Sequence, residues 1–275
     1  MYIDSHIHFW QLERGDYYWL KPESKLLYRN YLPEQLLPEL TNNQVEGVIA
    51  VQAASTVAET DYLLDLAERH RWILGVVGGF SPLSPDFMAE YDRLRQRDRF
   101  AGIRIDGACL AAVHTAESDL LLTQLRKFAD DQFPIDLLIR THDLDNALAC
   151  LAQVPELRVV INHLGAPYYA DEDDLGKWSA GMEQAAQYPG ATCKISGIIT
   201  QAAKAGTAAA DPYIKKLFAC FGAERLMFGS DWPVALQGGG YEQVVELFES
   251  LLPASLSEAD KEKVRSDNAK AFYLK

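Results

Sequence analysis

Short apolar runs alternate along the chain with longer stretches in which apolar residues recur at helical spacing. The short runs are rich in Val and Ile and are typical of buried strands, whereas the longer stretches predict amphipathic helices. The pattern predicts strands at residues 1–9, 45–52, 73–80, 102–105, 134–140, 157–163, 191–196 and 226–231. It predicts helices at residues 33–43, 56–71, 85–97, 117–131, 174–188, 212–221, 241–252 and 257–272, and a further helix that ends at residue 154.

This repeated order of strand and then helix predicts a single domain over residues 1–275, a parallel (β/α)8 barrel of the TIM type. An open, doubly wound sheet fits less well, because no glycine-rich phosphate-binding fingerprint follows any of the strands. Gly238, Gly239 and Gly240 come after a loop and not directly after a strand, so we expect them to form a flexible loop.

The first predicted strand carries two histidines on one face. With a period of two, Asp4, His6 and His8 point to one side of the strand and the residues between them point to the other. Two imidazoles that point the same way are suited to bind one metal ion or one polar group of a substrate. The alternative is a half-buried strand whose polar face carries histidines without a function.

A second stretch, near the other end of the chain, favours the functional interpretation. Residues 226–233 form an apolar run that ends at Asp231 and is stopped by Pro233. The first and last strands of a closed barrel are neighbours, so we expect Asp231 to approach His6 and His8.

Several other predicted strands also end in, or carry, a polar residue. They contribute Arg104, Arg140, His163 and Lys194. A single arginine or lysine at a strand end is more often solvated or paired with an acid than functional. In a barrel, however, the carboxyl ends of all strands meet at the face where active sites form, so the joint pattern predicts a polar site there.

The segment between the first strand and the first helix, residues 10–31, is rich in aromatic and charged residues and is long for a loop. Because it follows a strand, it emerges at the predicted active-site face and is a candidate lid. The alternative is a surface flap that packs its own aromatic side chains.

Charge and cysteine content exclude some classes of function. The chain has 26 Lys and Arg against 39 Asp and Glu, a formal net charge of −13, which argues against nucleic acid or an anionic membrane as a partner. The four cysteines are far apart and form no metal-binding motif, which is typical of reduced thiols in the cytoplasm. We find no signal peptide or membrane-spanning run and expect a soluble, cytoplasmic monomer or homodimer.

The chain resembles the amidohydrolase superfamily, and within it the branch of sugar-acid and pyrone lactonases that includes L-fuconolactonases and L-rhamnonolactonases. The most specific matches are the His-x-His-Phe-Trp start at residues 6–10 and the Phe-Gly-Ser-Asp-Trp-Pro motif at residues 228–233. Other matching stretches follow in the same order at residues 15–20, 51–53, 102–104, 136–140, 163–165, 193–197 and 268–273.

The resemblance implies a distorted (β/α)8 barrel in which His6, His8, His163 and Asp231 line the site. These four residues would also be the ligands of a single metal ion, Zn²⁺ or Mn²⁺. Some members of the branch work without a metal, so the alternative is that the protein has no cofactor. Where relatives with two metals carry a bridging Lys or Glu and a further His, this chain has arginines, which argues against a two-metal site. A Gly-Ala-Pro sequence at residues 165–167 replaces the usual Gly-Lys-Pro, which leaves the substrate open.

The function expected from these residues and this resemblance is hydrolysis of the ester bond of a sugar-acid (aldonic acid) lactone, in carbohydrate metabolism. Asp231 would act as the general base on water, and the three histidines would hold the carbonyl oxygen. Asp4 would have a structural role and would fix either the backbone of a loop or the tautomer of an imidazole. The expected substrate-binding residues are Arg104, Arg140, Lys194, Trp10, Trp19 and Trp232.

Three alternatives remain open from the sequence. The same residues could isomerise a sugar lactone, which would release no net acid. A related branch consists of metal-dependent nonoxidative decarboxylases. Outside enzymes, the chain could be a barrel that binds sugar acids without turnover.

Overall fold

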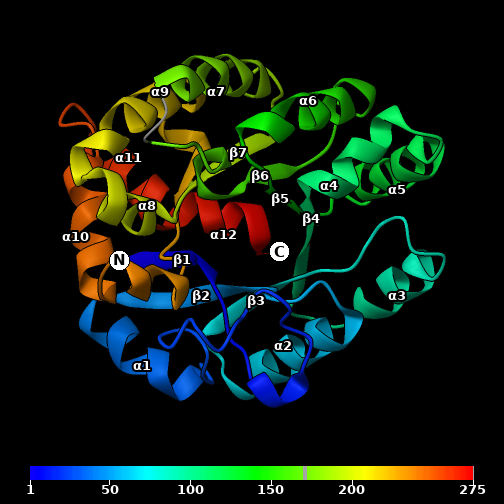
Figure 1. The fold of residues 1–275 in the computed structure, drawn as a ribbon, viewed down its shortest axis with the longest axis horizontal. Helices are drawn as coiled ribbons and strands as arrows, with labels where there is room; N and C mark the ends of the chain where they lie inside the picture. Colours follow the sequence, from blue (N-terminus) through cyan, green and yellow to red (C-terminus); the bar gives the residue numbers. More distant parts are fainter. Residues whose placement is uncertain (170–171, 275) are drawn as a thin grey trace.

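The computed structural model describes residues 1–169 and 172–274, which form one eight-stranded parallel sheet surrounded by helices (Figure 1). The strands follow one another around the sheet in chain order, from β1 to β8. This topology confirms the predicted TIM-type (β/α)8 barrel. The strands are β1 Tyr2–Ile7, β2 Val45–Val51, β3 Ile73–Gly78, β4 Phe100–Asp106, β5 Ile135–Leu138, β6 Val159–Ile161, β7 Ala191–Ile195 and β8 Leu226–Phe228.

The barrel closes between β1 and the segment that follows β8. Ile7 forms a parallel bridge with Trp232, and the backbone N–H of His8 donates to the carbonyl of Trp232 at 2.7 Å. The N–H of Asp231 donates to the carbonyl of His6 at 2.8 Å. These bonds hold Asp231 directly beside the strand that carries the two histidines, as the barrel hypothesis predicted.

The helices cover the outer face of the barrel (Figure 1). Most lie where the apolar periodicity predicted them, but α4 and α8 were not predicted, and the last predicted helix contains a π-helical turn at Lys263–Asp267. The helices are α1 Pro33–Asn42, α2 Val57–Arg69, α3 Phe87–Leu94, α4 Gly107–Leu110, α5 Ser118–Asp130, α6 Leu144–Gln153, α7 Glu172–Ala185, α8 Ile198–Ala205, α9 Asp211–Phe221, α10 Tyr241–Leu251, α11 Glu258–Glu262 and α12 Asn268–Tyr273.

Apolar side chains close the end of the barrel opposite the carboxyl ends of the strands. Inward-facing residues of five strands form one cluster there with Ala269, Phe272 and Tyr273 of α12. In Figure 1 the end of α12 accordingly lies inside the ring of strands. The strand residues of this cluster are Ile3, Ile49, Val51, Val77, Val160 and Met227.

The aromatic segment after β1 is folded back on itself. Its ends pair through an antiparallel bridge between Trp10 and Tyr31. Within the segment, the side chains of Tyr17, Leu20 and Leu27 are buried. The packing of its own aromatic residues agrees with the surface-flap alternative. In the part of the chain that the structure describes, no helix has the length and hydropathy needed to cross a membrane.

Candidate active site

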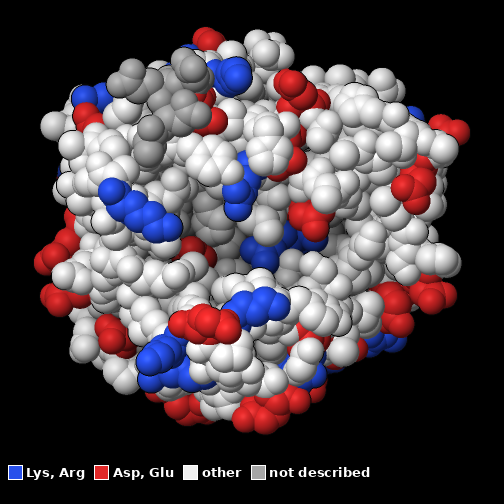
Figure 2. Space-filling model, in the orientation of Figure 1, with Lys and Arg blue, Asp and Glu red and all other residues white. Residues whose placement is uncertain are grey.

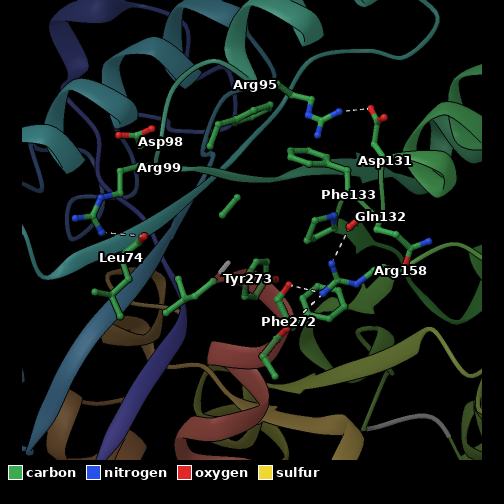
Figure 3. A pocket seen from close by; sticks show the side chains of 15 residues that line it. Leu74, Arg95, Asp98, Arg99, Asp131, Gln132, Phe133, Arg158, Phe272 and Tyr273 are labelled. Carbon is green, nitrogen blue, oxygen red and sulfur yellow. Dashed lines mark hydrogen bonds and ion pairs between the residues drawn. The ribbon is translucent and has the colours of Figure 1, made fainter.

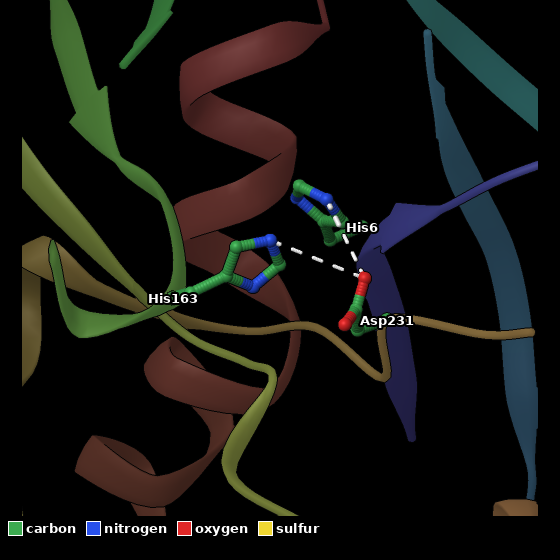
Figure 4. Close-up of side chains that lie close together, drawn as sticks. All are labelled: His6, His163 and Asp231. Atoms are coloured by element: carbon green, nitrogen blue, oxygen red, sulfur yellow. Dashed lines mark ion pairs between the residues drawn. The ribbon is translucent and has the colours of Figure 1, made fainter. Parts of the chain in front are cut away.

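Three imidazoles and one carboxylate meet at the carboxyl ends of the strands (Figure 4 shows three of the four residues). Oδ1 of Asp231 lies 3.4 Å from Nε2 of His8, 3.9 Å from Nε2 of His6 and 4.0 Å from Nε2 of His163. The structure therefore brings together all four residues that the sequence suggested as catalytic or metal-binding.

Two of the four residues have left-handed backbone conformations. His163 has φ of 54° and Asp231 has φ of 63°, values that residues other than glycine rarely adopt. Such a conformation costs on the order of 1–3 kcal/mol and persists only where the surroundings enforce it. Strain of this kind is concentrated at functional sites, where it fixes the direction of a side chain.

Asp4 helps to hold the backbone around Asp231 in this conformation. Its carboxylate accepts hydrogen bonds from the backbone N–H of Ser230 at 2.9 Å and of His6 at 3.1 Å, and from the hydroxyl of Tyr241 at 2.7 Å. Asp4 is fully buried and joins β1 to the loop that carries Asp231. This is the structural role that its position on the first strand predicted.

Hydrogen bonds also set the orientation of two imidazoles. Nδ1 of His8 lies 2.7 Å from the carbonyl of Val51, which can only accept, so Nδ1 carries the proton and Nε2 presents its lone pair to the site. Nδ1 of His163 lies 2.9 Å from the hydroxyl of Ser196. Gly197 follows with φ of 68°, and a Cβ there would approach Nδ1 of His163 to 2.9 Å, so glycine is needed for this contact.

Burial keeps all three imidazoles neutral. Burial and the nearby charge of Arg104 together lower the pKa of His8 to about 3, and they lower that of His163 to about 4 against the opposing effect of Asp231. The pKa of His6 falls well below its usual range for the same reasons. Burial raises the pKa of Asp231, against the opposing effect of His163, Arg104 and Lys194. Neutral imidazole is the form that binds metal, and a raised pKa makes a carboxylate a stronger base.

The donor set fits one divalent metal ion. Nε2 of His6 is buried and has no hydrogen-bond partner among the described residues, and donor atoms of His6, His163 and Asp231 all lie within 4.8 Å of one another. With bonds of about 2.0–2.1 Å, ligand atoms of a tetrahedral zinc ion are about 3.4 Å apart. The distance from Asp231 to Nε2 of His8 equals that value, and the distances to Nε2 of His6 and His163 are longer, at 3.9 Å and 4.0 Å.

Lys194 lies beneath the histidines and is fully buried. Its ammonium contacts Oδ2 of Asp136 at 2.6 Å, the carbonyl of Ser5 at 2.7 Å and Nδ1 of His6 at 3.3 Å. The sequence interpretation placed Lys194 against the substrate, and the structure places its charged group between a carboxylate and the back of an imidazole.

The two arginines occupy different positions around the site. Arg104 donates to the carbonyl of Gln52 at 2.5 Å, and its Nε has no partner within the described ranges. It lines a cavity of about 240 Å³ between the ends of β3 and β4. Arg140 is exposed, hydrogen-bonds the hydroxyl of Tyr168 and lines a separate cavity of about 350 Å³ with Lys204. Figure 2 shows basic side chains around the hollow on this face.

The three candidate tryptophans differ in exposure. Trp10 is fully buried and Trp232 is 3% exposed, and Tyr31 packs against both rings. Trp19 is 45% exposed, and its indole N–H donates to the carbonyl of Ala53, in the loop after β2. Of the three, only Trp19 has a large surface available for contact with another molecule.

Two functional neighbours were missed from the sequence. Asp136 accepts hydrogen bonds from Lys194, from Asn162 at 2.9 Å and from the hydroxyl of Tyr273 at 2.5 Å. A carboxylate inside the apolar run 135–139 was a signal that pointed to Asp136. Tyr273 lies in the matching stretch 268–273, but the sequence did not indicate its role, because its partner is more than a hundred residues away.

Comparisons with known proteins identify the family of the chain. A sequence model of the amidohydrolase family matches residues 3–275. The chain is 32% identical to an L-fucono-1,5-lactonase of Burkholderia ambifaria over 87% of this chain and 82% of the relative, and 32% identical to an L-fucono-1,5-lactonase of Burkholderia multivorans over 98% and 95%.

Among solved structures, an amidohydrolase from Burkholderia multivorans with bound zinc superimposes with a TM-score of 0.91 at 30% identity and covers 99% of both chains. The same protein with bound HEPES gives a TM-score of 0.91 at 28% identity. With the family match over almost the whole chain and the curated relatives above 30% identity, the protein is a hydrolase that belongs to the amidohydrolase family.

Proposed function

We propose that the protein hydrolyses the ester bond of a sugar-acid lactone. The observation that carries the proposal is the convergence of three neutral imidazoles on Asp231, whose pKa burial raises. The two L-fucono-1,5-lactonase relatives identify the class of substrate, and L-fucono-1,5-lactone is the first compound to test.

In this proposal Asp231 is the general base. Its carboxylate takes a proton from the attacking water as the new C–O bond forms at the lactone carbonyl. It returns the proton to the ring oxygen when the C–O bond of the ring breaks, which gives the open hydroxy acid. Because the chain keeps Asp231 in a fixed left-handed conformation, the base is held in place before the substrate binds.

His6, His163 and Asp231, whose donor atoms lie together, would hold a single Zn²⁺ or Mn²⁺, with His8 as the fourth ligand because its Nε2 lies 3.4 Å from Asp231. The bound zinc in the Burkholderia multivorans structure supports a metal site in this family. Such an ion, when bound, supplies Lewis-acid polarisation of an ester carbonyl. Lys194 keeps His6 in position from behind, and Arg104 and Arg140 are available for substrate oxygens at the mouth.

The proposal is tested by acid release from a panel of sugar-acid lactones that differ in stereochemistry and ring size, measured with a pH indicator. We expect rapid release from one stereochemical set. Asp231→Asn should lower kcat by about 10²- to 10⁴-fold, because a positioned general base contributes that much. The matched control is Asp130→Asn, an exposed carboxylate at the end of α5.

Two results would contradict the proposal. Near-normal turnover by Asp231→Asn would remove Asp231 as the base. Conversion of lactones without net acid, detected by NMR of the products, would replace hydrolysis with isomerisation.

A further inference from the structure

A cavity of about 560 Å³ lies at the end of the barrel opposite the catalytic residues (Figure 3). It is bounded by the residues around the start of β4 and β5 and by the end of α12. Its volume is in the range of ligand-binding sites for small molecules, which is about 300–1,000 Å³. None of the proposed catalytic residues lines it.

Three arginines line this cavity, Arg95, Arg99 and Arg158, together with two aspartates, Asp98 and Asp131. Arg95 is paired with Asp131, and Asp131 also accepts from Lys127 at 2.7 Å. The local balance is therefore positive in a protein whose net charge is −13.

Arg158 is held in place by uncharged groups. Its guanidinium donates to the carbonyls of Gln132 at 2.7 Å and of Phe272 at 2.8 Å, and lies 5.2 Å from the centre of the Phe272 ring. It has no carboxylate partner within residues 1–169 and 172–274. Burial lowers the pKa of Arg158, as expected for a cation whose charge is not balanced by a neighbour.

Arg99 lies on the other side of the cavity in Figure 3. It donates to the carbonyl of Leu74 at 3.1 Å, and among the residues described it forms no ion pair, although Asp98 is its neighbour in the chain. A guanidinium has five N–H donors in a planar array, so Arg99 and Arg158 both retain donors for a ligand.

We propose that this cavity binds a small organic anion, a carboxylate or phosphate joined to an apolar or aromatic body. The anionic group would accept charge-assisted hydrogen bonds from Arg158, and Arg99 across the cavity would add a second cationic donor, the kind of interaction by which arginine recognises such groups. The body would lie against Phe133 and Phe272, which line the same cavity. The proposal does not depend on the lactonase reaction.

The cavity also adjoins the catalytic centre through one residue. Tyr273 lines the cavity, and its hydroxyl donates to Asp136, which in turn pairs with Lys194. An anion bound in the cavity would therefore contact Tyr273, which supports Asp136 and Lys194, without entering the active site.

The experiment is direct binding of phenyl phosphate and benzoate to the intact protein by isothermal titration calorimetry, with benzyl alcohol as the uncharged probe. We expect saturable binding of an anion and none of the alcohol. Arg158→Gln and Arg99→Gln should each weaken binding by about 10-fold or more, because each removes a charge-assisted hydrogen bond. Arg71→Gln, an exposed arginine just before β3 and outside the cavity, should bind as the wild type does.

Arg158→Gln also removes hydrogen bonds to three backbone carbonyls, those of Gln132, Ala271 and Phe272, so Arg158→Lys and Arg99→Gln are measured beside it, with circular dichroism to confirm folding. Absence of saturable binding by both anions would overturn the proposal. Binding that survives in both folded glutamine variants would place the anion elsewhere and overturn it equally. Because the readout is binding and not turnover, this failure is distinct from failure of the proposed hydrolysis.

Discussion

At the scale of single residues, the molecule buries several ionisable groups. Specific hydrogen bonds and ion pairs offset the free energy that is lost when these groups leave water. Asp136 and Lys194 pair at 2.6 Å with both side chains fully buried. Removing one partner of such a pair leaves an uncompensated charge and costs about 3–5 kcal/mol. The pair is therefore best understood as a fixed support for His6.

Glu59 on α2 is a buried carboxyl that forms no ion pair with any of the described residues. One oxygen accepts from the backbone N–H of Ala53 at 2.8 Å, and the other has no hydrogen-bond partner among the described residues. Burial raises its pKa from 4.5 to about 8. Through Ala53, Glu59 fixes the loop whose neighbouring carbonyls accept from Arg104 and Trp19.

This pKa predicts a pH dependence of stability. The folded protein retains the Glu59 proton between pH 4.5 and about 8, whereas the unfolded chain releases it. The contribution of Glu59 to the free energy of unfolding is therefore fully present below pH 4.5 and is lost as the pH rises from there through about 8. Within this range the slope is at most about 1.4 kcal/mol per pH unit. Urea unfolding of Glu59→Gln across this range should lack that component of the slope.

The control for this measurement is Glu156→Gln, an exposed residue before β6. It should retain the wild-type pH dependence. Parallel curves for the wild type and Glu59→Gln would mean that Glu59 is ionised in the folded protein.

At the scale of elements, α12 has a function beyond covering the barrel. Its last residue, Tyr273, enters the barrel interior and donates to Asp136, and the Lys194 ammonium lies 5.1 Å from the centre of its ring. A C-terminal helix thereby supports residues on β5 and β7.

Tyr273→Phe should lower the free energy of unfolding by about 1–3 kcal/mol, because the buried Asp136 loses a hydrogen bond. We also expect a lower kcat with a largely unchanged KM, since Lys194 and His6 would be less well positioned. Urea denaturation and steady-state kinetics on the best lactone measure the two effects. Tyr188→Phe is the matched control, because Tyr188 lies after α7 and away from these residues.

If Tyr273→Phe loses stability but keeps the wild-type kcat, the residue supports the fold alone. Equal loss in the Tyr188 variant would show that the effect is not specific to this hydrogen bond.

At the scale of the whole molecule, barrel closure creates the site by joining its first and last strands. The resulting donor set predicts binding of one Zn²⁺ or Mn²⁺ per chain. Such binding should raise the thermal midpoint, since a metal at 100 times its Kd adds about 2.7 kcal/mol to stability. His163→Gln should abolish most of this shift, and His114→Gln, an exposed residue, should not.

Metal analysis of the purified protein and thermal unfolding with and without a chelator provide the measurement. A stoichiometry near two would contradict the single-site interpretation. No shift on addition of either ion would favour the metal-free alternative.

Local patterns along the chain were sufficient to predict the fold and the meeting of His6, His8 and Asp231 at one end of the barrel. A period of two placed His6 and His8 on one face, and an apolar run ending at Asp231 placed that carboxylate at the catalytic end of the last strand. Strand and helix periods depend on neighbouring residues, so they can be recognised without any knowledge of distant contacts.

Long-range packing decided the remaining features. Lys194 faces Asp136 and His6, Trp10 lies in the core, and Tyr273 reaches Asp136 across 137 residues of chain. These positions depend on which strands are adjacent and on how α12 enters the barrel. A lysine and an aspartate can each be solvated or buried, and their residue types alone do not decide which. In the closed barrel Lys194 and Asp136 can be buried because each charge finds the other as its partner.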